Sequence, residues 1–284
     1  MIAVVVPVFN GAEVLGRTVP AVAGLTGVTD TVWVDDGSTD STLSVIAKYT
    51  SSSSRVLALS NNRGRATARN VGAAATRGEV VVFFDADVEP SAVAARALAS
   101  AALEPGAVAA VARLQPVPDD PSDPYQEYAA HHPRGPAPDH TGPLDWRFFL
   151  AGACAVRRDA FDQAGGFPES VAYGEDIALA ERLCAIAPEG LRLADTTVRL
   201  YDLGDLDRAV RHAEAFGEGL AHRQASVPLA RWAGRVPGAH LAAPLLRWAA
   251  THLPAGSTRR RAVRYLLGVS ALRAARRART RPPS

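Results

Sequence analysis

Cysteine is nearly absent from the sequence. Cys154 and Cys184 are the only two in 284 residues, which excludes a disulfide framework and a structural zinc site built from paired cysteines. A reducing, cytosolic setting is therefore expected. With 48% hydrophobic and 21% charged residues, the composition is that of a soluble globular protein that can bury a sizeable core.

Long hydrophobic runs are also lacking. No uncharged apolar run reaches the length needed to span a bilayer. The first residues, Met1–Phe9, enter an apolar segment without a basic leader or a cleavage site of small residues. We therefore expect the start of the chain to be a strand rather than a signal peptide.

Acidic residues are missing from the last part of the chain. No Asp or Glu follows Glu218, whereas 13 arginines lie between Arg223 and Arg281. The part before them has 18 basic and 29 acidic residues, a net charge near −11, and the tail carries +13. Such a tail can bind an anionic membrane surface, lipid phosphates, nucleic acid or the acidic front of its own chain.

Apolar runs alternate with helical patterns through the first half of the chain. The runs predict strands at residues 2–8, 31–34, 55–59, 80–84 and 107–114, and the helical patterns lie at 13–25, 41–49 and 91–103. Pro20 is expected to bend or split the first helix. Alternation of this kind indicates crossover units, a parallel sheet, and ligand binding outside the carboxyl ends of the strands.

Acidic residues follow two of these strands. Asp35 and Asp36 end one, and Asp85 and Asp87 follow the buried run 80–84. Carboxylates on a rigid strand end suit a divalent cation held against a diphosphate, so we interpret Asp85 and Asp87 as cation and nucleotide ligands. The alternative is structural, since Asp favours turns and helix starts.

Between these acids, Arg65 and Arg69 have helical spacing and share one helix face. Guanidinium groups beside a diphosphate can contact phosphate or base, although a solvated basic face would give the same pattern. Later in the chain, Glu175 and Asp176 open a helix, where carboxylates are favoured by position and also serve as caps. Gly152 would allow close approach of a ligand to the backbone.

Residues 115–144 contain eight prolines, which predicts a loop with one short helical piece near 125–130. A loop of this length is usually functional or disordered, and we interpret it as a mobile flap over the site. His131, His132 and His140 lie within it. Exposed loop histidines explain them better than a metal site does, because their spacing fixes no geometry.

Six motifs occur in the order typical of one family: Val6-Pro7-Val8-Phe9-Asn10, Val34-Asp35-Asp36-Gly37-Ser38-Thr39-Asp40, Ala68-Arg69-Asn70-Val71-Gly72, Phe84-Asp85-Ala86-Asp87, Gly165-Gly166-Phe167 and Gly174-Glu175-Asp176. In these motifs, over residues 2–217, the sequence resembles the inverting glycosyltransferases of family 2, which have the GT-A fold. The resemblance implies a Rossmann-like, mostly parallel sheet flanked by helices.

The resemblance also implies roles for individual residues. Pro7, Asn10, Asp36 and Arg69 would hold the base and ribose of a nucleotide. Asp85 would lie near the ribose and metal, and Asp87 would bind Mg²⁺ or Mn²⁺ directly. Asp176 would be the catalytic base, with Glu175 beside it.

The chemistry of these residue types agrees with that implication. A cation on carboxylate oxygens neutralises the diphosphate leaving group, and a carboxylate on the opposite side takes the proton of an attacking hydroxyl. One departure concerns a histidine that many members have after the last strand of the catalytic domain. Here Asp202 lies in that stretch, and either Asp202 or His212 is a candidate further ligand.

The tail is expected to be helical, with stretches at 205–223, 240–252 and 258–279. The last combines Val263, Leu266, Leu267, Val269 and Leu272 with arginines at both ends. This pattern is typical of an amphipathic helix on a membrane surface, and equally of a helix packed on the protein with its arginines in water.

The domain prediction is a GT-A domain over residues 1–218 and a basic helical tail over 219–284. Within the domain, 1–114 would bind the nucleotide sugar, 115–145 would be the flexible loop, and 146–218 would supply the acceptor side and the base.

The predicted function is metal-dependent transfer of a hexose from a nucleotide-diphosphate sugar, with UDP-sugar favoured, to a hydroxyl of a lipid-linked or cell-envelope glycan or of a small metabolite. A degenerate nucleotide-sugar-binding or membrane-associated assembly protein and a nucleotidyltransferase are the alternatives. The expected location is cytoplasmic, peripheral on the inner face of the plasma membrane if the tail binds lipid, with no nucleic acid partner.

Overall fold

The computed structural model describes residues 1–48, 54–132, 134–135, 140, 142–171, 173–222 and 243–280. The chain forms two compact units. The first comprises Met1–Gln115, Pro133–Ser170 and Glu175–Tyr201, and the second comprises Pro116–His132, Val171–Gly174 and Asp202–Ser284. The second unit therefore combines the tail with two segments from earlier in the sequence.

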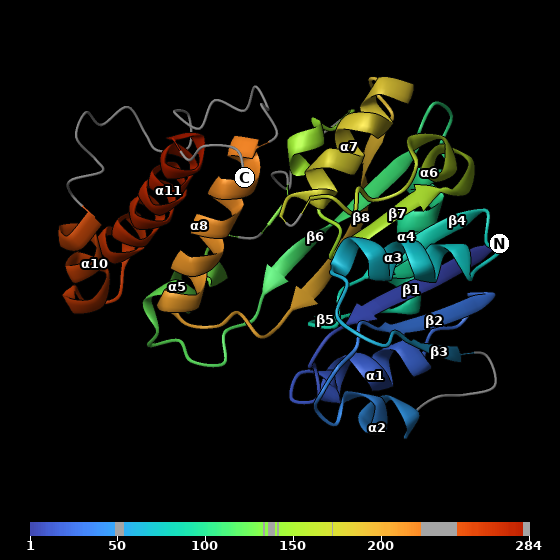
Figure 1. The fold of residues 1–284 in the computed structure, drawn as a ribbon, viewed down its shortest axis with the longest axis horizontal. Coiled ribbons are helices and arrows are strands. Elements are labelled where there is room, and N and C mark those ends of the chain that lie inside the picture. Colours follow the sequence, from blue (N-terminus) through green and yellow to red (C-terminus); the bar gives the residue numbers. More distant parts are fainter. Residues whose placement is uncertain are drawn as a thin grey trace. The chain divides into compact units, whose positions relative to one another are not determined.

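The first unit is built on a mixed sheet. In the described residues this sheet has eight strands in the order β3-β2-β1-β4-β7-β6-β8-β5. The strands are β1 (Ile2–Val8), β2 (Asp30–Asp35), β3 (Ser54–Ala58), β4 (Val80–Phe84), β5 (Val88–Glu89), β6 (Ala109–Pro116), β7 (Ala153–Arg157) and β8 (Leu191–Leu200). Figure 1 shows β1, β2 and β3 side by side.

Strand direction divides the sheet into two halves. Strands β1, β2, β3 and β4 run parallel to one another, as the alternation of strands and helices predicts. Strand β7 is antiparallel to both β4 and β6, and β5 is antiparallel to β8. The expectation of a parallel sheet thus holds for the first half only, because a buried apolar run carries no information about strand direction.

Helices flank this sheet. They are α1 (Leu15–Ala23), α2 (Thr42–Ala47), α3 (Arg65–Ala74), α4 (Ala92–Ala102), the 3-10 turn η1 (Trp146–Phe148), α6 (Arg158–Ala164) and α7 (Glu175–Ile186). Side chains of α3, α6 and α7 form one core cluster with β1, β2, β4, β6 and β7. Helix α1 continues past Pro20 to Ala23, so of the two expected effects of this proline, a bend or a split, the split is wrong.

Close packing of α3 on the sheet depends on a glycine. A side chain at Gly72 would collide with Val5 of β1. Below it, Val5, Val34 and Phe83 are fully buried, and the rings of Phe83 and Phe167 meet edge to face with centroids 5.2 Å apart. This core fixes α3 against β1 and β2, and the acidic pair Asp35 and Asp36 lies at the carboxyl end of β2.

The second unit is helical, with α5 (Pro124–Ala130), α8 (Leu206–His222), α10 (Ala243–His252) and α11 (Ser257–Thr280). Helix α11 lies alongside α8 and α10 and also contacts α5 (Figure 1). Its apolar stripe is buried, with Val263, Leu266 and Val269 at most 3% exposed. Of the two alternatives for this helix, the structure supports the one in which the stripe packs on the protein.

A buried ion pair fixes α11 to α5. Glu127 is 8% exposed and accepts a hydrogen bond from Arg259 Nε at 2.6 Å, from Arg260 Nη1 at 3.0 Å and from the Gly256 backbone N–H at 2.8 Å. Part of the proline-rich segment is therefore held by the tail. Within the described residues, no helix is both long and apolar enough to cross a membrane.

Candidate active site at the strand ends

Asp36 organises the loop that leads into α3. It is 3% exposed, and its Oδ1 and Oδ2 accept the backbone N–H groups of Arg63 and Gly64, each at 2.8 Å. These N–H groups precede the first turn of α3, where a negative charge is favoured by the helix dipole. Asp36 therefore shapes the loop beside the predicted nucleotide site.

The loops after β1 and β2 are joined through Asn10. Its Oδ1 accepts the Thr39 N–H at 2.8 Å, and its own N–H donates to Ser38 Oγ at 2.8 Å. Asn10 is exposed and has a φ of 47°, a left-handed conformation that asparagine tolerates better than most residues. Pro7 is buried in β1, three residues before Asn10. The predicted base and ribose residues Pro7, Asn10 and Asp36 therefore lie at neighbouring strand ends.

The turn that carries Asp85 and Asp87 is held rigidly. The hydroxyl of Thr18 in α1 lies 2.7 Å from the carbonyl oxygens of both Ala86 and Val88, to which it donates. The Asp87 carbonyl oxygen accepts the Tyr201 N–H at 2.8 Å. Both acidic side chains are only partly buried. The turn thus presents two carboxylates on a fixed backbone.

Arg69 connects this turn to the start of α7. Its guanidinium is 2% exposed and donates through Nη2 to Asp85 Oδ1 at 2.7 Å and through Nη1 to Glu175 Oε1 at 3.0 Å. It also lies 5.2 Å from the ring centroid of Phe167. Burial alone would lower the pKa of Arg69, but the carboxylates of Asp85 and Glu175 outweigh it and raise that pKa.

Glu175 and Asp176 have different environments although they are adjacent. Glu175 is 3% exposed and is contacted by two cations, Arg69 and, at 3.4 Å, the Nε of Arg65. Asp176 is half-buried, and its Oδ1 accepts the Ile177 N–H at 2.8 Å. Burial, followed by the charge of Glu175, raises the pKa of Asp176 from 3.8 to about 6.

The structure therefore brings several predicted site residues together. Asp85, Glu175 and Asp176 all act electrostatically on the one guanidinium of Arg69, although they come from two motifs about 90 residues apart. Sequence reasoning placed Arg69 on the nucleotide. In the structure two of its guanidinium nitrogens are used by carboxylates, and no local signal in the sequence indicates these long-range pairs.

A divalent cation fits the donor set at this turn. Asp85 and Asp87 offer carboxylate oxygens, the ligands that Mg²⁺ and Mn²⁺ prefer. Gly152 keeps space beside Asp85, because a Cβ at Gly152 would lie 3.0 Å from Asp85 Oδ2. In the described part of the chain, no group of three or more His, Cys, Asp or Glu side chains could by itself hold a metal ion.

The two candidate further ligands lie in the second unit. Asp202 has a φ of 48° and accepts from Arg208 Nη1 through both oxygens, at 2.8 and 2.9 Å. His212 has its ring 5.7 Å from that of Tyr173. A role of either residue in metal binding stays a prediction.

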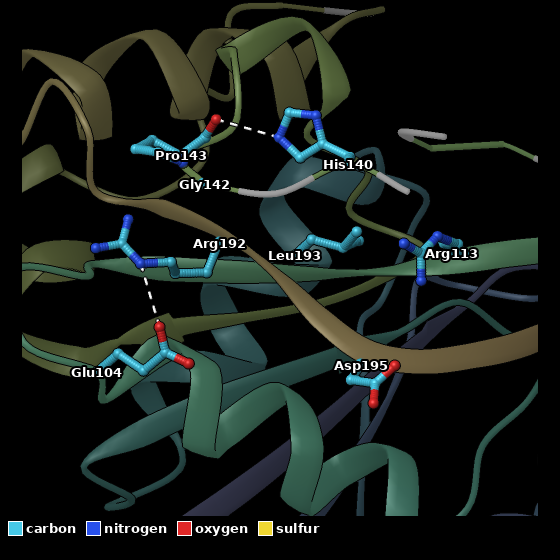
Figure 2. Close-up of a pocket in the computed structure, with 8 residues that line it drawn as sticks. All are labelled: Glu104, Arg113, His140, Gly142, Pro143, Arg192, Leu193 and Asp195. Atoms are coloured by element: carbon cyan, nitrogen blue, oxygen red, sulfur yellow. Dashed lines mark hydrogen bonds and ion pairs between the residues drawn. The ribbon is translucent and has the colours of Figure 1, made fainter. Parts of the chain in front are cut away.

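A separate cavity of about 480 Å³ lies beside β6 and β8 in the first unit. Figure 2 shows its lining residues: Glu104, Arg113, His140, Gly142, Pro143, Arg192, Leu193 and Asp195. Within it, Arg192 Nε lies 3.3 Å from Glu104 Oε2, and His140 Nε2 donates to the Pro143 carbonyl oxygen at 3.3 Å. None of the predicted catalytic or metal residues lines this cavity.

Comparison with solved structures shows that the fold is of the GT-A type. A solved structure of Staphylococcus aureus TarS superposes with a TM-score of 0.59 at 20% identity, covering 90% of this chain and 44% of TarS. The mannosyltransferase PcManGT from Pyrobaculum calidifontis gives 0.57 at 20% identity, covering 98% of this chain and 73% of that protein. Similarity at this level establishes the fold.

The sequence establishes the family. Residues 3–165, more than half of the chain, match glycosyl transferase family 2, and the chain belongs to this family. It is 29% identical over 186 residues to the pre-mycofactocin glycosyltransferase of Mycobacterium tuberculosis, and 37% identical over 84 residues to the succinoglycan biosynthesis protein ExoO of Rhizobium meliloti.

These alignments cover 64% and 29% of this chain, respectively. The chain spans only 38% of the first relative and 24% of the second.

Proposed function

We propose that the chain is a metal-dependent, inverting glycosyltransferase that moves a hexose from a nucleotide-diphosphate sugar to an acceptor hydroxyl. The observation that carries the proposal is the bridge made by Arg69 between Asp85, on the donor side, and Glu175, next to Asp176. This bridge holds the donor-side carboxylates and the carboxylates at the start of α7 in one site. A protein that only bound the nucleotide sugar would not need the second pair.

Asp176 is the proposed general base. With a pKa of about 6 it is mostly ionised at neutral pH, and it is a stronger base than an ordinary aspartate. It would take the proton of the acceptor hydroxyl as that oxygen attacks the anomeric carbon, while the nucleotide diphosphate leaves from the opposite face. Displacement in this sense inverts the anomeric centre. Glu175, held by Arg69 and Arg65, would orient the helix that carries the base.

Asp87 and Asp85 would hold Mg²⁺ or Mn²⁺. When bound, the ion supplies positive charge that stabilises the diphosphate leaving group. Asp85 remains able to serve because its pairing with Arg69 uses Oδ1 alone. The loop residues Pro7, Asn10 and Asp36 are proposed to hold the base and ribose.

Two neighbours support a nucleotide-sugar donor. TarS residues 1–349 have been solved with UDP-GlcNAc, and PcManGT has been solved with GDP-Man and Mn²⁺. Both nucleotides are consistent with this fold, and we favour a UDP-sugar. The acceptor would be a lipid-linked or cell-envelope glycan or a small metabolite. The proposed location is cytoplasmic, with a peripheral contact to the membrane.

The test is hydrolysis of a panel of UDP-, GDP-, TDP- and CDP-sugars with Mn²⁺, with Mg²⁺ and with chelator. We expect one nucleotide to be preferred and the chelator to abolish turnover. Asp87→Ala should lose metal-dependent nucleotide binding in a thermal-shift assay, whereas Asp176→Asn should bind the donor and fail to transfer. Asp195→Asn, an exposed acid of the separate cavity, is the matched control and should remain active.

Two results would contradict the proposal. Turnover that needs no metal and persists in Asp87→Ala would show that Asp87 does not act through a metal ion. Full activity of Asp176→Asn would show that Asp176 is not the general base. Release of a nucleoside monophosphate and a sugar 1-phosphate, rather than a nucleoside diphosphate and a free sugar, would instead favour the nucleotidyltransferase alternative.

A further inference from the structure

Helices α10 and α11 expose large apolar side chains. On α10, Leu245 is 66% and Trp248 54% exposed, and on α11 Tyr265 is 42% exposed. Arg261 and Arg264 are exposed on the same side of α11 as Tyr265, because positions 261, 264 and 265 fall within about a third of a helical turn. These five residues are here called the α10–α11 surface.

Folding of the second unit does not account for this exposure. The unit already buries a separate apolar stripe of α11, including Val263 and Leu266, and Ala250 of α10 is fully buried. Leu245 and Trp248 point away from that core. Leu245 and Trp248 are three positions apart and are therefore neighbours on the helix surface, and contiguous exposed apolar area of this kind marks an interaction site.

The charge of this surface is positive and largely uncompensated. No acid occurs after Glu218, and neighbouring arginines use the acids that are within reach: Arg259 and Arg260 pair with Glu127, and Arg247 with Asp207. Within the described residues, neither Arg261 nor Arg264 makes an ion pair. Their guanidinium groups are therefore available to an anionic partner.

We propose that the α10–α11 surface docks on an anionic lipid bilayer. Arginines attract acidic headgroups, tryptophan and tyrosine favour the headgroup level, and Leu245 can enter the acyl boundary. This contact differs from insertion of the apolar stripe of α11, which is buried in the protein. Nucleic acid would satisfy the arginines but leave Leu245 in water, so the bilayer is the better match. The proposal does not depend on the transferase activity.

The test uses the full chain and sedimentation with phosphatidylcholine vesicles, with and without phosphatidylglycerol. We expect binding only with the anionic lipid, weakening as salt rises. The double variant Arg261→Gln with Arg264→Gln should bind about 25-fold more weakly, at about fivefold per arginine. Lys48→Gln is the control: it removes an exposed positive charge that lies in the first unit, and it should bind normally.

A second readout reports the orientation. Bromine-labelled lipid should quench part of the tryptophan fluorescence of the bound protein, and Trp248→Phe should remove that part while circular dichroism shows the fold unchanged. Equal binding to both vesicle types, an unaffected double variant, or unchanged quenching in Trp248→Phe would each overturn the proposal. So would a short duplex DNA that binds as tightly as the vesicles and displaces them.

Discussion

Replacing Asp176 by asparagine should abolish transfer and at the same time make the folded protein more stable at neutral pH. The carboxylate is half-buried beside the negative charge of Glu175, which is why its pKa rises from 3.8 to about 6. Asparagine removes the charge but keeps an oxygen that can accept the Ile177 N–H. If the ionised Asp176 carboxylate is the catalytic base and also destabilises the folded state, Asp176→Asn should show both the loss of transfer and the gain in stability.

The magnitude follows from the difference between the two pKa values. Since the pKa is higher in the folded state, ionised Asp176 destabilises that state fully above pH 6, and the cost disappears as the pH falls toward 3.8. At about 1.4 kcal/mol per pH unit, the full cost is on the order of 2–3 kcal/mol. Asp176→Asn should therefore gain about that much above pH 7 and almost nothing near pH 4.

Urea unfolding at several pH values would measure this gain. In parallel, transfer by the unmodified enzyme should fall about tenfold per pH unit below pH 6, because the base becomes protonated. Glu175→Gln is the informative neighbour: it should destabilise the fold, since it leaves Arg69 and Arg65 without their shared acid. If Asp176→Asn were less stable at pH 7.5, or its gain did not depend on pH, the assigned environment would be wrong.

Three further predictions concern stability and can be measured by denaturant unfolding. Arg69→Gln should lose about 3–5 kcal/mol because it removes the partner of the buried Glu175 and of the partly buried Asp85, whereas exposed Arg55→Gln should lose less than about 1 kcal/mol. Glu127→Ala should destabilise by about 3 kcal/mol or more, and no change there would contradict the buried pairing with Arg259. Gly72→Ala should lose about 1–3 kcal/mol through its clash with β1; an unchanged midpoint would show that α3 can shift freely.

The local pattern of the sequence was sufficient for the strands and helices of the first 114 residues, apart from the two-residue strand β5. Buried runs such as 80–84 predicted β4, and the short helical piece near 125–130 matches α5. The pattern did not predict the direction of each strand relative to its neighbour. Strand β7 lies antiparallel to β4, and an apolar run looks the same in a parallel and in an antiparallel strand.

The candidate site divides in the same way. Motif order indicated that Asp85 and Asp176 belong to one site, but it did not reveal that Arg69 holds Asp85 and Glu175 together across 16 and 106 residues of chain. Pairing at such separation depends on how helices pack over the sheet, which residue spacing along one helix does not encode. The same limit applies to the helix predicted at 258–279: its amphipathic pattern is the same whether its apolar side packs on lipid or on protein.

The ion pair between Glu127 and Arg259 affects how deletion experiments should be designed. A shortened chain ending before Gly256 would remove all three donors to the Glu127 carboxylate, together with the helix that packs along α8. Loss of activity after such trimming would then report collapse around α5 rather than a missing anchor. Substitutions of exposed residues on α10 and α11 are therefore a better test, because they can change membrane binding without unfolding the second unit.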